Sequence, residues 1–272
     1  MAYSDIHPTA IIAPDAKIAE GVVIGPYAVI GKKTTIGAGT YIGPHCVIEN
    51  TTMGEKNEII AAAFIGVKPQ DLSYDGIESM VALGDGNQVR EGVTIHRSTS
   101  LEHPTTIGSN CLFMANTHVA HDCVLGNNII MVNNAGIAGH VAVADNAILS
   151  GMVAVHQFVR VGRLAMVSGL SGLPLDVPPF CRASGGRAKL VGLNTVGLRR
   201  NGFNRDMIAA VKAAYKQLFH STKTLRESIE ILRKNNPAPE VLEMIEFIEN
   251  SKRGITAARR KKNKDFSEGD NE

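Results

Sequence analysis

Side chains able to perform acid-base or nucleophilic chemistry concentrate in the middle of this chain. Residues 118–123 read HVAHDC, and four of the nine histidines lie in one stretch: His118, His121, His140 and His156. An imidazole titrates near neutral pH and suits a general base, a set of three histidines binds zinc in some enzymes, and Cys123 is a candidate nucleophile. The plainer alternative is that these histidines only line a polar outer face.

An apolar residue recurs at every sixth position around this segment. One unbroken series runs from Ile107 to Leu173, and an earlier one from Ile6 to Ile48 consists only of isoleucines. A helix repeats its buried face near 3.6 residues and a strand at two, so neither alone explains a period of six. The period predicts a parallel β-helix, in which short strands and bends coil around a continuous core.

The repeat has two interruptions and an end. Residues 67–80 and 96–106 break the period and predict loops, which in repeat proteins tend to carry the binding face. The prolines that follow Leu173 predict that the repeat stops there. They are Pro174, Pro178 and Pro179.

Helical spacing replaces the period of six near the C-terminus. It predicts one helix over 205–220, a second that begins at Thr224 with Glu227 completing a capping box, and a third over about 239–250. We therefore expect a β-helix over residues 1–190, a helical domain over 191–256 and a disordered tail over 257–272.

The composition limits the class of protein. With 44% hydrophobic and 20% charged residues, the chain is expected to fold into a globular protein. Its four cysteines form no CxxC pair, which favours reduced thiols over a secreted disulfide scaffold. Neither a signal peptide nor a membrane-spanning stretch is evident, so we expect a cytoplasmic protein.

Positive charge gathers near the C-terminus. Residues 199–264 contain 16 Lys and Arg against 7 Asp and Glu, although the formal net charge of the whole chain is only +2. This excess is either a solvated face or a docking surface for an acidic partner, whose approach it would speed. Nucleic acid is not favoured, because no reader motif or interleaved aromatic residues accompany the charge.

Several motifs together carry a resemblance to a known family. They are IHPTA, PQDL, VREGVTIHR, HVAHDC, AGHV, SGMVAVHQF with Ser150 where a second Gly is usual, DVPP and NTVGLRRNGF. Over roughly residues 5–255 the chain resembles the UDP-N-acetylglucosamine acyltransferases, which perform the first step of lipid A synthesis. The resemblance implies a left-handed β-helix with 18 residues per coil, a homotrimer, and no cofactor or bound metal.

The resemblance also implies a reaction and roles for individual residues. An (R)-3-hydroxyacyl chain passes from acyl carrier protein to the 3-hydroxyl of UDP-N-acetylglucosamine, with no acyl-enzyme. His121 matches the general base, Asp122 a residue that supports it, and the backbone N–H of Gly139 the donor to the oxyanion. With 18 residues per coil, His121 stacks under Gly139 and Gln157, and Asp122 under His140 and Phe158. Cys123 stacks under Val141 and Val159, which favours a buried thiol.

Substrate contacts follow from the same resemblance. Those for the sugar nucleotide are Asp71, His118, His140 and Gln157. Those near the nucleotide or the carrier's pantetheine are His156, Asn194 and Arg200. Gly169 matches the residue that ends the acyl groove and sets chain length, and its column partners are Gly151 and Asn133.

Three departures from the family pattern leave the acceptor open. Ser73 stands where Lys is usual after PQDL, Val196 where Glu is frequent, and Asn201 where Arg is customary. The acceptor is therefore either the 3-hydroxyl sugar or an analogue with a 3-amino group. Two remote alternatives are a zinc-dependent β-helix carbonic anhydrase, which uses three histidines, and a solenoid scaffold without catalysis.

Overall fold

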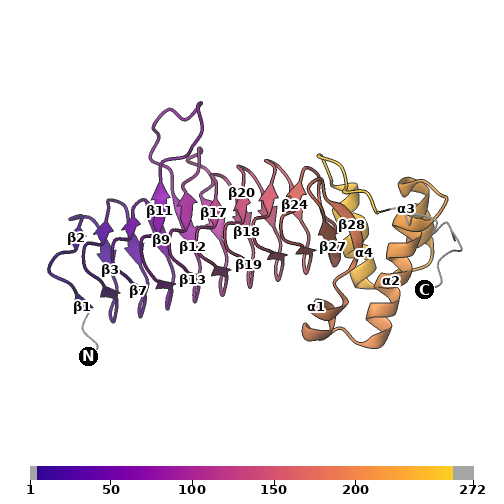
Figure 1. The fold of residues 1–272 in the computed structure, drawn as a ribbon, viewed down its shortest axis with the longest axis horizontal. Helices are drawn as coiled ribbons and strands as arrows, with labels where there is room; N and C mark the ends of the chain where they lie inside the picture. Colours follow the sequence, from indigo (N-terminus) through magenta and orange to yellow (C-terminus); the bar gives the residue numbers. More distant parts are fainter. Residues whose placement is uncertain (1–4, 260–272) are drawn as a thin grey trace, which may run out of the picture.

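The computed structural model describes residues 5–259, which form a long parallel β-solenoid followed by four helices (Figure 1). Three sheets of 11, 9 and 8 strands make the solenoid walls, and successive strands of the chain pass from one sheet to the next. The predicted β-helix with a helical C-terminal part is therefore confirmed.

Most strands are only two residues long, as a period of six requires. Sheet A contains β1 (Asp5–Ile6), β4 (Val23–Ile24), β7 (Tyr41–Ile42), β10 (Glu58–Ile59), β13 (Gln88–Val89), β16 (Leu112–Phe113), β19 (Ile130–Met131), β22 (Ile148–Leu149), β25 (Met166–Val167), β27 (Cys181–Ser184) and β28 (Lys189–Leu193). Sheet B contains β2 (Ile11–Ile12), β5 (Val29–Ile30), β8 (Val47–Ile48), β11 (Phe64–Val67), β14 (Thr94–His96), β17 (His118–Val119), β20 (Gly136–Ile137), β23 (Ala154–Val155) and β26 (Gly172–Leu173). Sheet C contains β3 (Lys17–Ile18), β6 (Thr35–Ile36), β9 (Thr51–Met53), β12 (Val81–Leu83), β15 (Thr105–Ile107), β18 (Val124–Leu125), β21 (Ala142–Val143) and β24 (Arg160–Val161).

The apolar residue of each hexad points into the solenoid. Ile30, Ile48 and Ile95 are fully buried, whereas Ile6 is 40% exposed because it lies in the first of the coils within residues 5–259 and is covered by a described coil on one side only. Side chains alternate across a strand, so the residue before each apolar position faces outward. The core is thus a continuous column of aliphatic side chains whose burial drives folding.

Both predicted loops are present but slightly shorter than predicted, because Val67 belongs to β11, His96 to β14, and Thr105 and Thr106 to β15. One lies between β11 and β12 and rises above the solenoid in Figure 1, and the other lies between β14 and β15. Arg97, only 5% exposed, fastens the first loop to the coil. Its guanidinium donates to the Tyr74 hydroxyl at 3.0 and 3.1 Å, to Glu49 Oε1 at 2.9 Å and to the Gly66 carbonyl at 3.0 Å.

The prediction that the repeat stops at Leu173 is wrong. β27 pairs in parallel with β25, so sheet A gains one more strand, and the solenoid part of one more coil, beyond the three prolines. The prolines lie in the connecting segment rather than in the strand, so none removes an N–H from the β27 ladder. β28 then pairs antiparallel with β27 and completes the sheet edge.

Part of the predicted disordered tail is ordered. Ala258 forms a β-bridge with Leu190, and the Arg259 N–H donates to the Leu190 carbonyl at 2.8 Å. Backbone pairing with β28 therefore holds residues 257–259, which the sequence had placed in the tail. The rest of that predicted tail, 260–272, lies outside the described residues.

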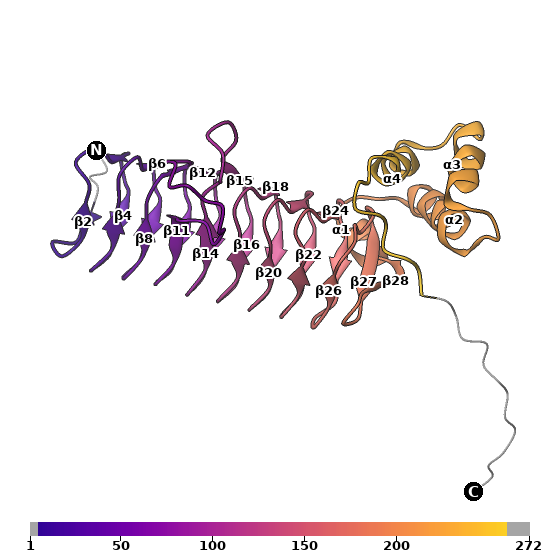
Figure 2. The same ribbon diagram turned by 90° about the horizontal axis from the view of Figure 1, so that it is seen from above.

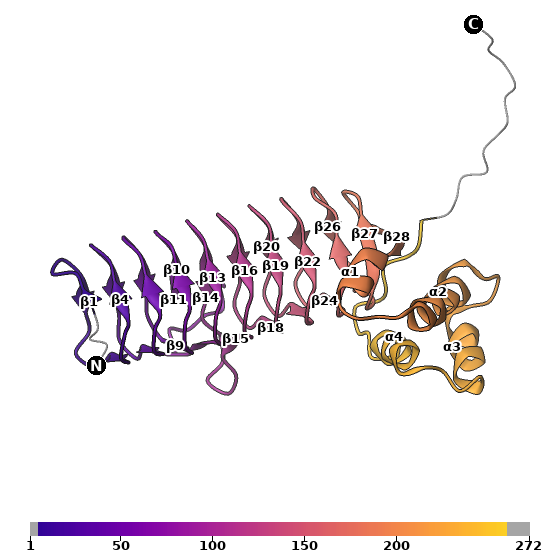
Figure 3. The same cartoon turned by 90° about the horizontal axis from the view of Figure 1, so that it is seen from below.

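The helices gather at the C-terminal end of the solenoid, as Figures 2 and 3 show. They are α1 (Thr195–Arg200), α2 (Arg205–His220), α3 (Leu225–Lys234) and α4 (Pro239–Glu249). Three of them match the predicted helices, and the capping box of Thr224 and Glu227 is formed. α1 was not predicted. Within residues 5–259, no helix has the length and apolar character needed to cross a bilayer.

Candidate active site

The HVAHDC segment begins with β17 of sheet B (His118–Val119) and continues through the bend that leads to β18 of sheet C. The His140 N–H donates to the His121 carbonyl at 3.1 Å, and the Phe158 N–H donates to the Gly139 carbonyl at 3.1 Å. The bends of successive coils are therefore stacked in the register expected from 18 residues per coil. The His140 ring stacks on the Phe158 ring at 4.6 Å between centroids.

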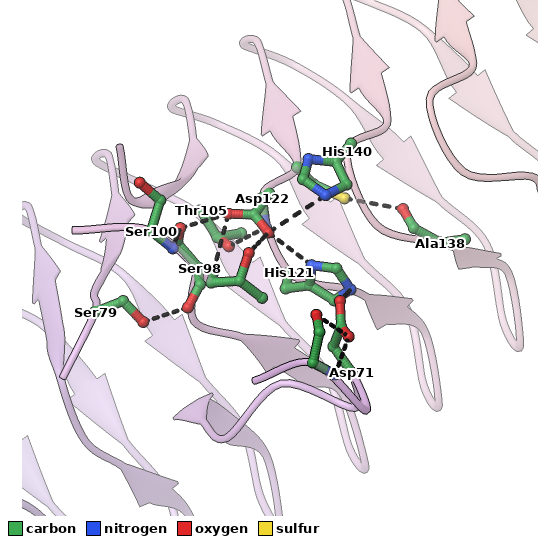
Figure 4. Close-up of polar contacts among 12 residues, drawn as sticks. Asp71, Ser79, Ser98, Ser100, Thr105, His121, Asp122, Ala138 and His140 are labelled. Carbon is green, nitrogen blue, oxygen red and sulfur yellow. Dashed lines mark hydrogen bonds and ion pairs between the residues drawn. The ribbon is translucent and has the colours of Figure 1, made fainter. Parts of the chain in front are cut away.

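His121 and Asp122 form a hydrogen-bonded pair at this corner (Figure 4). The His121 Nδ1 lies 2.6 Å from the Asp122 Oδ2, and His121 is 9% exposed. Burial alone would raise the pKa of Asp122, but hydrogen bonds from the Ser98 and Thr99 hydroxyls, His121 and the Thr99 N–H outweigh it and lower the pKa to about 2. Ionised Asp122 only accepts hydrogen bonds, so the His121 Nδ1 carries the proton and Nε2 is left free to accept one.

Asp71 approaches the other side of the His121 ring from the loop between β11 and β12. Its Oδ2 lies 3.6 Å from the His121 Nε2. Its Oδ1 accepts the Ser73 N–H at 2.8 Å and the Ser73 hydroxyl at 2.7 Å. These Ser73 hydrogen bonds, aided by the nearby His121 and His140, lower the pKa of Asp71. Two carboxylates therefore flank one imidazole.

Gly139 lies directly against the His121 ring. A Cβ added at Gly139 would lie 2.5 Å from His121 Cε1 and 2.7 Å from Nε2, so only glycine leaves room for the ring here. The Gly139 N–H donates to no acceptor within residues 5–259. The Gly139 backbone, whose N–H is unused, thus lies against the Nε2 edge of the His121 ring.

His118, His96 and Cys123 lie near His121 but are partly or fully buried within the solenoid wall. His118 Nδ1 lies 2.7 Å from the Thr94 Oγ1, and burial, followed by the nearby His121, lowers the pKa of His118. Burial also lowers the pKa of His96 to about 4, so His96 is neutral at pH 7. Burial raises the pKa of the Cys123 thiol to about 12, which confirms the buried thiol expected from the sequence and opposes a nucleophilic role.

Other predicted site residues lie away from this cluster. His156 and Gln157 occupy the same corner two coils further on, both are exposed, and within residues 5–259 neither hydrogen-bonds His121. Asn194 is buried as the N-cap of α1, with its side chain bonded to the Gly197 N–H and the Leu164 carbonyl. Asn194 and Arg200 line a pocket of about 510 Å³ on sheet A.

Gly169 also lies elsewhere. It is exposed in the bend between β25 of sheet A and β26 of sheet B, whereas His121 is in the bend between sheets B and C. Its stacking on Gly151 matches the predicted column, since the Leu170 N–H donates to the Gly151 carbonyl at 3.0 Å. One chain alone therefore does not bring Gly169 next to His121.

The carbonic anhydrase alternative requires three histidine ligands for zinc, and the donor atoms near His121 can be compared with that requirement. Side-chain donors of His121, Asp122 and His140 converge within 4.8 Å. This set has two imidazoles rather than three, and the His121 Nδ1 already hydrogen-bonds Asp122. His118, the remaining nearby candidate, directs its Nδ1 to Thr94. The arrangement does not fit the three-histidine zinc site of the carbonic anhydrase alternative.

Comparison with known proteins gives the family. The profile described as UDP N-acetylglucosamine O-acyltransferase, domain 2, matches residues 176–256, and the bacterial transferase hexapeptide profile matches residues 104–139. An acyl-[acyl-carrier-protein]–UDP-N-acetylglucosamine O-acyltransferase of Myxococcus xanthus is 49% identical over 93% of this chain and 99% of its own. The chain belongs to the UDP-N-acetylglucosamine O-acyltransferase family. It is an acyltransferase.

Solved structures agree with this assignment. The UDP-N-acetylglucosamine O-acyltransferase of Moraxella catarrhalis superposes with a TM-score of 0.89 at 42% identity, over 92% of this chain and 99% of that one. The Francisella novicida UDP-N-acetylglucosamine acyltransferase gives a TM-score of 0.91 at 37% identity, over 94% of this chain and 95% of that one. This acyltransferase therefore shares the whole architecture of the family, solenoid and helices together.

Sequence reasoning missed the groups that hold the two carboxylates. Ser98 and Thr99, in the loop between β14 and β15, bind Asp122, with the Thr99 Oγ1 at 2.7 Å from its Oδ2. Ser73 was noted only as a departure from the family pattern, yet it binds Asp71. The only signal in the sequence was that both loops interrupt the repeat next to HVAHDC.

The contact between Gly139 and His121 gives a first prediction. Gly139→Ala is expected to displace the imidazole and lower kcat by about ten- to a hundredfold, because small misplacements of catalytic groups are costly. Gly136→Ala is the matched control, since its new Cβ would lie at an ordinary 3.8 Å from His118 Cβ. Steady-state kinetics of both variants, with their melting temperatures, test this. Equal kcat values would contradict it.

The low pKa of Asp122 gives a second prediction. Folding lowers this pKa from 3.8 to about 2, so ionised Asp122 stabilises the folded protein above about pH 4, and that contribution is lost as the pH falls through about 2. Asp122→Asn should therefore lower the free energy of unfolding at neutral pH, and its difference from wild type should shrink between about pH 4 and pH 2. Urea unfolding across this range measures it; a difference independent of pH would refute the assignment.

Proposed function

We propose that this protein transfers an (R)-3-hydroxyacyl chain from acyl carrier protein to the 3-hydroxyl of UDP-N-acetylglucosamine, the first step of lipid A synthesis. The observation that carries the proposal is His121, hydrogen-bonded through Nδ1 to ionised Asp122 and packed against Gly139, whose N–H donates to no acceptor within residues 5–259. The names of the relatives supply the two substrates.

The bond changes follow from this arrangement. His121 Nε2 takes the proton of the sugar hydroxyl as its oxygen attacks the thioester carbonyl, and the oxyanion that forms accepts a hydrogen bond from the Gly139 N–H. The C–S bond then breaks, an ester remains on the sugar, and the proton on His121 passes to the departing thiolate. Asp122 stabilises the imidazolium that forms between these two events.

The burial of the Cys123 thiol supports direct transfer without an acyl-enzyme. Cys123 has no exposed surface, and its Sγ lies 3.2 Å from the Ala138 carbonyl. With a pKa of about 12 it is almost entirely protonated at neutral pH, and a thiol is a far weaker nucleophile than a thiolate.

The acceptor carries either a 3-hydroxyl or a 3-amino group, and the hydroxyl sugar is our proposal. The names of the relatives, which are O-acyltransferases, favour the hydroxyl sugar. Ser73 in place of the usual Lys removes a positive charge beside Asp71 and is the feature that would favour an amino sugar. Mass spectrometry of the product formed with each acceptor decides between an ester and an amide.

We further propose that the enzyme works as a homotrimer. Within one chain the predicted substrate residues fall on separate faces: His121 at the corner of sheets B and C, Asn194 and Arg200 on sheet A, and Gly169 at the corner of sheets A and B. A neighbouring copy would place the second and third groups beside the first. The basic C-terminal region is the proposed docking surface for the acidic carrier protein.

The cytoplasmic location stays a prediction from the sequence.

The proposed base gives a third prediction. His121→Ala should lower the rate by about 10² to 10⁴, the usual contribution of a positioned general base, with little change in thermal stability. His140→Ala, which leaves the pair of His121 and Asp122 in place, is the control and should lose less. More than a tenth of wild-type turnover in His121→Ala would contradict the role.

The proposed acyl ruler gives a fourth prediction. Gly169→Met should close the groove and shift preference to chains about four carbons shorter, because each excluded methylene costs about 0.8 kcal/mol, or roughly a hundredfold in selectivity for four of them. Competition among carrier proteins loaded with hydroxyacyl chains of about 10, 12 and 14 carbons measures the preference. A folded, active variant with the wild-type preference would show that Gly169 does not set chain length.

A further inference from the structure

A second, positively charged pocket lies on the same side of the solenoid as the His121 cluster. It has a volume of about 660 Å³ and shares His140 and Phe158 with the bend column of the active site. At its far end it is lined by Arg160, Lys252 and Arg253. The pocket therefore connects the catalytic corner with basic side chains near the C-terminus.

The acidic group in this pocket is already hydrogen-bonded within the protein. Asp176 is fully buried, and its carboxylate accepts the Arg160 N–H at 2.8 Å and the Ser251 hydroxyl at 2.8 Å. Lys252, in contrast, is exposed, and its ammonium has no hydrogen-bond or ion-pair partner within residues 5–259. The pocket thus presents unused positive charge, which favours an anion.

The segment that carries Lys252 is firmly placed. The Asp176 N–H donates to the Gly254 carbonyl at 2.9 Å, the Thr256 N–H donates to the Asp176 carbonyl at 2.8 Å, and the Arg253 Nε donates to the Pro174 carbonyl at 2.9 Å. Lys252 is therefore held at the level of the coil that contains Asp176, rather than on a loose end.

The coil on which Lys252 is held gives its approximate distance along the axis from the His121 corner. Stepping from Asp122 through His140 and Phe158 to the coil of Asp176 crosses three inter-strand spacings of about 4.8 Å, or roughly 14 Å along the axis. A phosphopantetheine arm has about a dozen bonds of roughly 1.3 to 1.5 Å between sulfur and phosphorus and reaches about 15 Å when extended. In UDP-N-acetylglucosamine the nearer phosphorus is only about five bonds, or roughly 6 Å, from the 3-hydroxyl oxygen.

We propose that this pocket binds the phosphodiester of the acyl donor's phosphopantetheine arm, with Lys252 as its principal cation and the arm running over Phe158 and His140 to the thioester. The inference rests on the proposed function. Arg160 supports the pocket wall instead of supplying the principal charge. Its guanidinium donates to the Asn250 carbonyl at 2.9 Å, at the end of α4, and stacks on the Phe247 ring at 4.1 Å.

The test uses two small donors with the same hydroxyacyl chain, one on phosphopantetheine and one on pantetheine without the phosphate. The wild-type enzyme should use the phosphorylated donor at least tenfold more efficiently, as kcat/KM. Lys252→Ala should lower that ratio about tenfold, Lys252→Glu further, and Lys252→Arg should restore most of it. The KM for UDP-N-acetylglucosamine should stay within about twofold. These magnitudes follow from one charge-assisted contact to phosphate.

Lys212→Ala is the matched control, because Lys212 is an exposed lysine of α2 outside the pocket. It should leave the ratio between the two small donors unchanged, even if it weakens use of the intact carrier protein. An unchanged donor ratio in Lys252→Ala, or a raised KM for the sugar nucleotide alone, would overturn the phosphate site. Failure of the wild-type enzyme to acylate the sugar with either small donor or with acyl carrier protein would instead overturn the proposed function.

Discussion

Backbone hydrogen bonding between successive coils is the constraint on which the structure depends. Each coil returns the chain to the same place about one inter-strand spacing further along the axis, so the bends of successive coils form columns. The His140 N–H bonded to the His121 carbonyl and the Phe158 N–H bonded to the Gly139 carbonyl are two links of one such column. His121, the proposed base, and Gly139, the proposed amide donor, lie on different coils and are thereby brought together by the shared register.

The bends impose a second requirement. Their corner residues adopt left-handed backbone conformations, with φ of 58° at Asp122, 60° at His140 and 64° at Phe158. Asparagine, aspartate and histidine tolerate this conformation better than most residues, and Asn128 and Asn146 serve in the same way at another corner. Asp122 and His140 therefore meet a backbone requirement of the fold as well as a requirement of the site.

The sequence predicted the repeating register and missed several contacts that no period describes. The hexad period gave the coils, the buried Cys123 and the column through His121, because each follows from a register that every coil shares. Hydrogen bonds from Ser73 to Asp71 and from Thr99 to Asp122 arise in loops of irregular backbone, which no period describes. The coil beyond Pro179 was missed for a related reason, since its pairing with β25 depends on tertiary contact that overrides the local proline signal.

The two carboxylates beside His121 differ in how firmly they are held, and this difference suits their proposed roles. Asp122 is fixed by groups of the loop after β14 and lies at hydrogen-bond distance, 2.6 Å, from Nδ1. Asp71 is held by Ser73 and lies 3.6 Å from Nε2, beyond a normal hydrogen bond. A substrate hydroxyl that donates to Nε2 would also come within reach of Asp71, so this carboxylate would orient the acceptor while Asp122 orients the base.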